Sequence, residues 1–448
     1  MSRLRGAVPQ ATVSRPRAQA PPATVNRPRV RAPRVTVAAA AGLAAAVLAA
    51  GCGSAARPAA SATATPGPGA VALPLSSSVT GAHATWATVP MGTVGPNLFW
   101  QLFVLPAGAT RWTLTTPPDI ATNGAITLAA GDGTALVTGI LPSHLLGFSP
   151  ITSTANDGRS WAASAPDPGL ASVPDAMAAA PDGSELITLD HNGQVDLGRP
   201  GTAARPRLTS AAALAATTAG GACALAGLTA AAFTPAGSPL LAGQCARPGV
   251  AGIFLDAGGT WQAAGPALPA SLAGERLEVI RLTRTGSGLS ALLQAGAGRS
   301  ATLVAAWSST GSRWTLSPPL RLDGQAVLSS SFGSGSLAVG LTGRHGELLA
   351  APSATWQPLP ELPPGRAVTL ALPAAGDVDA LAATGSVLTA WQLHAPPAAR
   401  TSSAATAGAS SAATAGASSA AATAGAYGPG SWTQIQRTTV PIQYGSSS

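Results

Sequence analysis

Residues that could carry catalysis or hold a metal are few in this chain and lie far apart. The five histidines occur singly, at His83, His144, His191, His345 and His394. No motif of spaced histidines and carboxylates indicates a metal centre, and no nucleophile-elbow or phosphate-loop motif occurs. Asp377-Val378-Asp379 places two carboxylates on one face of a strand, where they could hold a cation, although two solvated acids are the commoner case. The sequence therefore predicts no metal, no cofactor and no catalytic residue.

Two of the three cysteines, Cys223 and Cys245, are 22 residues apart and have no further ligand at metal-site spacing. In an exported chain this pair predicts a disulfide, which in the chain-entropy model contributes about 3 kcal/mol to stability. Two free buried thiols are the alternative.

The third cysteine, Cys52, follows a segment typical of an export signal. Eight arginines and no acidic residue occur in the first 34 positions, and an Ala-rich apolar run, 35–51, comes next. The run is short for a membrane span of about 20 residues. It ends in Leu48-Ala49-Ala50-Gly51-Cys52, which resembles the lipobox of bacterial lipoproteins, although that family prefers Leu at the position of Ala49.

The lipobox resemblance implies that residues 1–51 are a signal peptide and that Cys52 is the lipidated N-terminus of the mature protein. The protein would then be held on the outer face of the cytoplasmic membrane. An ordinary secretory signal or an uncleaved anchor are the alternatives. The long n-region also leaves open a start codon downstream of Met1.

The positive charge is confined to the signal segment. Of the 25 basic residues, all of them arginine, eight lie in the first 34 positions, and the other 17 balance the 17 acidic residues. The mature chain therefore lacks the electrostatic footprint of a nucleic-acid binder. The absence of lysine, with abundant Ala, Gly, Pro and Arg, indicates a high-GC genome and, with the lipobox, a bacterial source.

Composition divides the mature chain into four parts. Residues 52–80 are small and polar and predict a flexible tether behind Cys52. Residues 81–394 predict the folded domain. Residues 395–430 hold three near-identical copies, 402–409, 410–417 and 418–426, and predict a low-complexity linker. Residues 431–448 alternate like a strand up to Ile442 and predict a closing strand and tail.

The folded part has the pattern of an all-β protein. Short apolar runs are separated by the turn dipeptides Asp132-Gly133, Asp182-Gly183, Asn192-Gly193 and Asp323-Gly324, which predict hairpins. The runs are 125–129, 135–140, 185–189, 326–330 and 336–339. Only the Ala-rich segment 210–218 competes as a helix.

Tryptophans mark a repeat. The segments Thr154 to Trp161 and Phe254 to Trp261 resemble the Asp box of sialidase-like β-propellers, and a worn copy with Ser309 and Gly311 ends at Trp314. Weaker echoes end at Trp112 and Trp356, and the next tryptophan along the chain is Trp391. In that family the boxes are structural and lie away from the ligand face. The resemblance therefore implies a scaffold role for Asn156, Gly158, Trp161, Asp256, Gly258, Trp261 and Trp314.

The tryptophans recur every 35 to 53 residues if the 100 residues between Trp161 and Trp261 are two units with one tryptophan lost. A folded span of about 335 residues with a unit of about 48 predicts an all-β propeller of about seven blades, with six or eight as alternatives. We expect the C-terminal strand to close the ring by pairing with strands near 84–89.

The same resemblance raises sialidase activity, and the sequence argues against it. The Arg motif of that family is absent, and the only tyrosines are Tyr427 and Tyr444. Arg281, Arg284, Arg299 and Arg344 could supply positive charge. We therefore expect a monomeric, non-catalytic propeller that binds a protein, glycan or cell-envelope ligand. The alternative is a propeller-type glycoside hydrolase with an atypical active site.

Overall fold

A computed structural model describes residues 69–70, 76–81, 83–92, 98–117, 126–131, 136–139, 151–163, 174–202, 205–286, 288–333, 335–365, 367–373, 377–394 and 431–441. All of them belong to one compact unit, Thr65–Ser448. The predictions for the signal peptide, Cys52 and the linker 395–430 lie outside the described residues.

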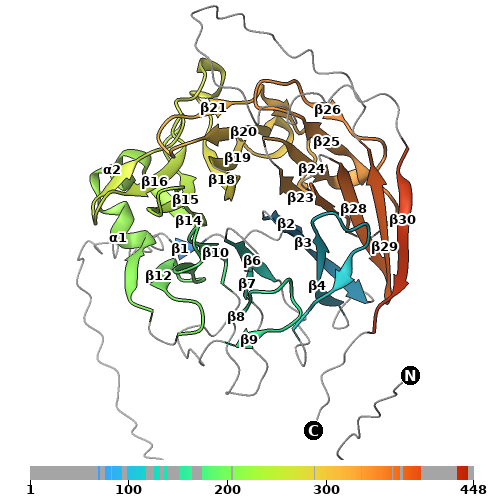
Figure 1. Ribbon diagram of the computed structural model, residues 1–448. Coiled ribbons are helices and arrows are strands. Elements are labelled where there is room, and N and C mark those ends of the chain that lie inside the picture. Colours follow the sequence, from blue (N-terminus) through green and yellow to red (C-terminus); the bar gives the residue numbers. More distant parts are fainter. Residues whose placement is uncertain are drawn as a thin grey trace, which may run out of the picture. The chain divides into compact units, whose positions relative to one another are not determined.

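The described chain forms seven four-stranded antiparallel blades around a ring (Figure 1). Blade 1 contains β2 (Ser76–Thr80), β3 (Ala84–Gly92), β4 (Leu98–Pro106) and β5 (Thr113–Leu114). Blade 2 contains β6 (Thr127–Ala130), β7 (Leu136–Gly139), β8 (Ile151–Thr154) and β9 (Ala162–Ala163). Blade 3 contains β10 (Ala176–Ala179), β11 (Leu186–Leu189), β12 (Gln194–Gly198) and β13 (Arg207–Ser210). Blade 4 contains β14 (Leu225–Phe233), β15 (Pro239–Cys245), β16 (Gly252–Asp256) and β17 (Trp261–Ala263).

The remaining blades follow in chain order. Blade 5 contains β18 (Leu277–Thr285), β19 (Gly288–Ala295), β20 (Thr302–Ser308) and β21 (Thr315–Leu316), with β22 (Leu320–Arg321) also paired to β20. Blade 6 contains β23 (Val327–Phe332), β24 (Leu337–Leu341), β25 (Gly346–Leu349) and β26 (Gln357–Pro358). Blade 7 contains β27 (Thr369–Ala371), β28 (Val378–Thr384), β29 (Val387–Leu393) and β30 (Thr433–Thr439). The predicted all-β propeller and its blade number are confirmed.

Short helices connect some strands. The Ala-rich segment between blades 3 and 4 forms α1 (Ala211–Ala215) and α2 (Thr218–Cys223), so the one predicted helical competitor is helical. Their N-caps are Ser210 and Thr217, whose hydroxyls accept the amides of Ala213 and Gly220. In the described part of the chain, single 3-10 turns occur at Ala270–Leu272, Gly298–Ser300 and Thr342–Arg344.

The core of the ring is divided among the seams between blades. The described residues form seven apolar clusters, and each lies mainly between two neighbouring blades. At the seam of blades 1 and 2, Trp86 packs with Leu128, and at the seam of blades 7 and 1, Val89 packs with Leu381. Apolar burial contributes roughly 25 cal/mol per Å2, so these clusters are the main force that closes the ring.

A tryptophan stands at or directly before the outer strand in every blade except blade 3, and it contacts the preceding blade. The indole N–H groups of Trp314, Trp356 and Trp432 donate to the carbonyl oxygens of Ala264 (2.6 Å), Pro318 (2.8 Å) and Pro360 (3.3 Å). These residues follow the outer strands of blades 4, 5 and 6. The tryptophan period therefore reports contacts between blades.

In blades 1, 2 and 4 the tryptophan at this position also contacts the preceding blade, but through other interactions. Trp112 reaches back from blade 1 to blade 7, and Trp161 of blade 2 makes an edge-to-face contact with Trp86 of blade 1. Trp261 packs against the cluster between blades 3 and 4. The predicted unit without a tryptophan is blade 3. The interval to Trp391 was misleading, because Trp391 lies inside β29 and the equivalent residue is Trp432.

The C-terminal strand completes the ring in a way that the sequence did not predict. Strand β30 pairs with β29, from Val387↔Thr439 to Gln392↔Thr433, and not with the strand near 84–89. It is therefore the outer strand of blade 7. Its link to blade 1 is made by a side chain: Gln436 accepts the Trp112 amide through Oε1 and donates to the Trp112 carbonyl through Nε2.

The ring begins earlier than the predicted tether ends. Residues 76–80 form β2, the inner strand of blade 1, where Ser78 and Thr80 donate hydrogen bonds to the carbonyls of Leu370 and Leu372 in blade 7. The small polar side chains of this strand have the composition of a linker, which is why the boundary at residue 80 was wrong. Ahead of it, β1 (Gly69–Ala70) pairs in parallel with β14 of blade 4.

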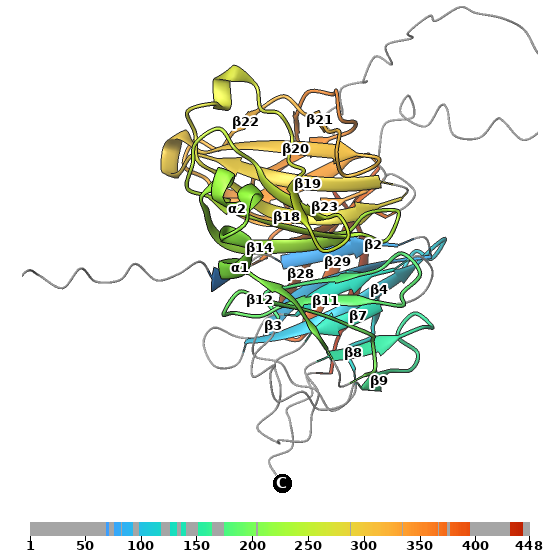
Figure 2. The same ribbon diagram turned by 90° about the vertical axis from the view of Figure 1, so that its left-hand side faces the viewer.

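Segments β1 and β2 bring the N-terminal chain across the ring. Strand β2 pairs with β3 of its own blade and, at Ser76 and Ser77, in parallel with β23 of blade 6. Figure 1 shows β1 and β2 on the inner side of the ring, and Figure 2 shows the same ring from its edge. The start of the described chain therefore joins blades 4, 6 and 1.

Two of the four predicted hairpin turns are confirmed. Asp182-Gly183 joins β10 to β11, and Asn192-Gly193 joins β11 to β12, with Gly183 and Gly193 at positive φ. Asp323-Gly324 is different, because it joins β22 of blade 5 to β23 of blade 6 and does not close a hairpin. Asp132-Gly133 lies outside the described residues.

Candidate functional site

The inner strands of six blades end around one cavity. The residues that line it come from the C-terminal ends of β2, β6, β10, β14, β18 and β23, and its volume is about 390 Å3. We call the end of the ring where the inner strands finish the cavity face. Because the blades are antiparallel meanders, the first and third turns of each blade also lie on this face.

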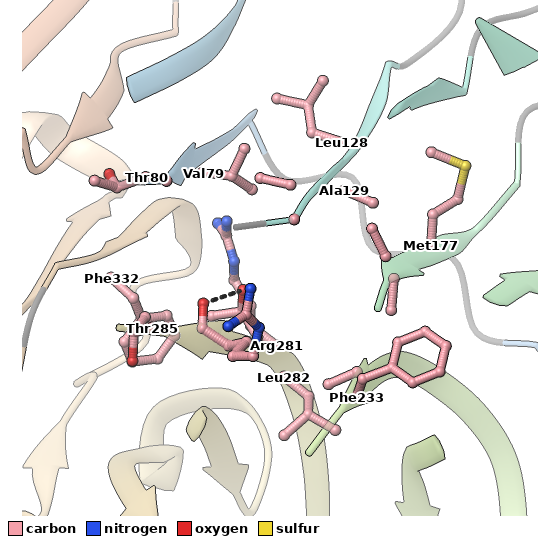
Figure 3. A pocket seen from close by; sticks show the side chains of 18 of the residues that line it. Val79, Thr80, Leu128, Ala129, Met177, Phe233, Arg281, Leu282, Thr285 and Phe332 are labelled. Atoms are coloured by element: carbon pink, nitrogen blue, oxygen red, sulfur yellow. Dashed lines mark hydrogen bonds between the residues drawn. The ribbon is translucent and has the colours of Figure 1, made fainter. Parts of the chain in front are cut away.

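The cavity wall is mostly apolar. Figure 3 shows Val79, Leu128, Met177, Phe233 and Phe332 on the five inner strands that border it. Hydroxyl groups are supplied by three threonines, Thr80, Thr283 and Thr285. A wall of this kind, apolar with a few polar groups, is typical of small-molecule and side-chain binding sites.

Arg281 supplies a positive charge to this cavity. It lies on β18, where Nη1 donates to the backbone oxygen (2.5 Å) and Oγ (3.2 Å) of Ser330 in blade 6, and Nη2 donates to the carbonyl oxygen of Ser78 in blade 1. The side chain of Arg281 therefore links blade 5 to blades 6 and 1, which are the two neighbours of blade 7. Burial lowers the pKa of Arg281 to about 10, so the group is still protonated at neutral pH.

Among the described residues that line the central cavity, all charged groups are basic. Arg284, three positions after Arg281 on β18, is the second, and no Asp, Glu, His or Cys belongs to the described lining. Of the four arginines singled out in the sequence, the structure brings these two together. Arg299 lies on a 3-10 turn, and Arg344 binds Glu361 and the Leu362 carbonyl.

A second cavity, of about 720 Å3, opens between blades 7 and 1 on the cavity face. Gly81, which follows β2, borders both cavities, so the two are neighbours. The second cavity is lined by Arg111, Arg437, Asp377 and Asp379 among other residues. It therefore carries both signs of charge.

Asp379 borders this cavity but its side chain exposes no surface, with 0% relative accessibility. Its Oδ2 accepts the indole N–H of Trp112 (2.9 Å), and its Oδ1 accepts Nε2 of Gln392 (3.1 Å). Burial raises the pKa of Asp379 to about 6, against the lowering effect of these two hydrogen bonds. Asp377 lies 3.4 Å from Nδ1 of His394. The two acids are thus not a pair of solvated carboxylates, and their nearest partners are protein groups.

The residues predicted to be scaffold form tight turns at the edge of the ring. Asn156 Oδ1 accepts the Ser160 amide (2.9 Å), and Thr154 Oγ1 accepts the Gly158 amide (3.0 Å). Gly158 has φ +75°, and a Cβ there would lie 1.6 Å from Oγ1 of Thr115 in blade 1. Only glycine fits this place.

The turns of blades 4 and 5 are built in the same manner. Asp256 Oδ1 accepts the Gly259 amide (2.6 Å), and Gly258 has φ +68°. In blade 5 the amide of Gly311 is accepted by Ser308, and not by Ser309, the residue that the sequence placed in this role. All three turns follow the third strand of a blade and so lie on the cavity face. None of the seven predicted scaffold residues lines either cavity.

The predicted disulfide is confirmed. Cys223 at the end of α2 and Cys245 at the end of β15 are joined, with Cα atoms 5.1 Å apart. Both are buried in the cluster between blades 3 and 4. The bond attaches the helical connection to blade 4 and lies outside both cavities.

Neither a metal-binding cluster nor a membrane-spanning helix is present among the described residues. No group of three or more His, Cys, Asp or Glu there could hold a metal ion. No helix among the described residues is long and apolar enough to cross a membrane.

Comparison with known proteins adds fold likenesses only. No protein-family model matches the chain, and no curated protein matches it. Among solved structures, YCF48 from Cyanidioschyzon merolae has 12% identity and a TM-score of 0.41, over 73% of this chain and 93% of that one. A structure of YCF48 bound to D1 peptide has 14% identity and a TM-score of 0.37, over 64% and 84%.

A GH74 xyloglucanase from Xanthomonas campestris has 14% identity and a TM-score of 0.44, over 73% of this chain and 52% of that one. At these values the likenesses carry no argument about activity. The class of this protein, a seven-bladed β-propeller, rests on its own strand order.

Proposed function

We propose that this protein is a lipid-anchored binding protein of the bacterial cell envelope, whose propeller binds a protein, glycan or envelope ligand through the central cavity without catalysis. The observation that supports this proposal most directly is the cavity itself, formed by the inner strands of six blades. Ligand contacts there would come from elements that the whole ring holds in place.

The composition of the central cavity favours binding over hydrolysis. Glycoside hydrolysis generally needs two carboxyl groups that flank the scissile bond. The described lining of the central cavity offers Arg281, Arg284, threonines and apolar groups, and no carboxylate. These residues can hold a ligand, but they supply no acid and base pair.

The second candidate is a glycoside hydrolase that uses the cavity between blades 7 and 1. Asp379 favours it, because a carboxyl group with a pKa raised to about 6 is suited to general acid catalysis. Against it, Asp379 exposes no surface, and both of its oxygens accept hydrogen bonds from Trp112 and Gln392. A group so placed does not reach a substrate oxygen, and we therefore favour binding.

A melting-temperature screen of the mature protein with defined peptides, oligosaccharides and cell-envelope fragments tests the proposal, since a ligand of the folded state raises stability by RT ln(1 + [L]/Kd). Ala130→Phe fills the central cavity from the end of β6 and is expected to abolish the shift given by a ligand. Ala263→Phe, on the exposed β17, is the matched control and is expected to keep it.

The fate of the ligand separates the two candidates. We expect it to be recovered unchanged after incubation. Conversion of a ligand to products, lost in Asp379→Asn and kept in Ala130→Phe, would establish the hydrolase instead.

A further inference from the structure

We propose that the central cavity is a carboxylate-binding site, with Arg281 as the anion-binding group and the surrounding apolar wall as the site for the body of the same ligand. This inference rests on the proposed binding function and names the chemistry that the cavity selects. The ligand is an apolar group that carries one carboxylate.

The first step of the argument is that Arg281 has only neutral partners. Its three hydrogen bonds go to two backbone oxygens and one hydroxyl, from Ser78 and Ser330. A guanidinium group has five N–H donors, so the three bonds leave two donors for a ligand. A fork of donors of this kind matches the two oxygens of a carboxylate.

The second step concerns charge. The pKa of Arg281 is lowered by burial alone, and no carboxylate offsets that effect. A cation held in a low-dielectric site by neutral oxygens has lost hydration that these dipoles restore only in part. An anion that enters the cavity therefore gains a Coulomb interaction that water does not screen fully.

The third step is the shape and polarity of the wall. The residues that line the cavity with Arg281 include Leu128, Met177, Phe233, Leu282 and Phe332, and the volume of about 390 Å3 is near the lower limit for ligand pockets. A polyanion or an oligosaccharide would bury unpaired polar groups against these side chains. An apolar body with a single carboxylate satisfies both the charge and the wall.

The test compares phenylacetate with phenylacetamide, which has nearly the same shape and no charge. Calorimetric titration of the mature protein is expected to show at least a tenfold tighter Kd for the acid. Equal affinities, or no detectable binding of the acid at about 10 mM, would overturn the proposal.

Two variants at one position separate charge from shape. Thr283 lines the cavity two residues from Arg281 on the same face of β18. Thr283→Asp adds a negative charge and is expected to remove the preference for the acid, whereas Thr283→Asn has the same size without the charge and is expected to keep it. The same preference in both variants would contradict the role of charge.

Arg281 itself is tested by Arg281→Gln and Arg281→Lys. The glutamine variant is expected to bind acid and amide alike, and the lysine variant to retain a smaller preference for the acid. Because Arg281 also joins three blades, a thermal melt accompanies each variant, and the Thr283 pair decides the question if the glutamine variant unfolds.

Failure of this inference is distinct from failure of the proposed function. If Ala130→Phe abolishes binding of a ligand found in the screen while acid and amide bind equally, the cavity is a binding site without anion preference. If the acid is preferred and Ala130→Phe binds it as well as the parent does, the anion site lies elsewhere, and both proposals for the central cavity fall.

Discussion

The stability of the folded protein is expected to depend on pH through Asp379. This residue is a buried carboxyl group whose two hydrogen-bond donors, Trp112 and Gln392, are both neutral. Its pKa in the folded protein is about 6, and its ordinary value is 3.8. The folded state therefore favours the protonated form. The stability that Asp379 contributes is fully present below about pH 3.8 and is lost as the pH rises through about 6.

The size of this effect follows from the shift in pKa. One pKa unit corresponds to 1.36 kcal/mol, so a shift of about two units costs the folded protein about 3 kcal/mol once Asp379 is ionised. Most of this loss falls between about pH 4 and pH 7.5. For a folded domain of this length, about 3 kcal/mol corresponds to roughly 4 °C in Tm.

The variant Asp379→Asn removes the ionisation and keeps the shape. The asparagine oxygen still accepts the Trp112 indole N–H, and Gln392 can turn its amide so that its oxygen accepts from the asparagine nitrogen. We expect Asp379→Asn to melt about 4 °C above the parent at pH 7.5 and within about 1 °C of it at pH 4.

Thermal melts by near-UV circular dichroism at the two pH values measure this difference. Asp323→Asn is the matched control, because it removes a carboxylate from an exposed turn whose φ of +50° asparagine tolerates. The control is expected to follow the parent at both pH values. If Asp379→Asn is less stable than the parent at pH 7.5, or if the difference is the same at pH 4, then the buried carboxylate is not the source of the pH dependence.

Three further predictions concern the ends of the chain and one turn. Truncation from Trp432 removes β30 from blade 7 and should lower Tm by 10 °C or more or prevent folding, whereas deletion of the repeats 402–426 should change Tm by less than about 2 °C; equal melts for the two deletions would show that the strand is dispensable. Cys52→Ala should abolish labelling with a palmitate analogue and release the protein from the membrane fraction, and undiminished labelling would exclude lipidation there. Gly158→Ala should lower the free energy of unfolding by about 2 to 4 kcal/mol, measured in urea, because a Cβ clashes with Thr115, and a neutral result would mean that the turn moves aside.

The sequence predicted the fold through two regular signals. The alternation of short apolar runs with turn dipeptides indicated strands, and the tryptophan period gave a unit length that led to seven blades. Both signals succeed because they recur from blade to blade: Gly183 supplies a positive φ at a hairpin, and Trp314, directly before the outer strand of its blade, donates a hydrogen bond to the preceding blade. The boundary at residue 80 failed because Ser78 and Thr80 stabilise β2 by hydrogen bonds and not by apolar burial.

The candidate site was less predictable, since it depends on which strands face the ring axis. Arg281 was singled out by charge alone, and nothing near it in the sequence indicates that Ser78, 203 positions away, accepts its hydrogen bond. Asp379 was visible as an acid on a strand, but its burial depends on Trp112 of blade 1. Long-range contacts of this kind have no local pattern. The signal in the sequence that could have pointed to the cavity is an arginine inside an apolar strand segment, Ile280-Arg281-Leu282.

The contacts that the tryptophans make with the preceding blade have a consequence for the order in which the ring assembles. Synthesis runs from the N-terminus, so the earlier blades are made before the later ones. Trp314, Trp356 and Trp432 each donate a hydrogen bond to a blade that is synthesised earlier. The surface on which each of these three blades packs is therefore made before the blade itself. Trp112 is the exception, because its partners Asp379 and Gln436 belong to the last blade. The first blade therefore remains incompletely bonded until the final strand arrives, and a truncated chain would expose that unfinished edge to other molecules.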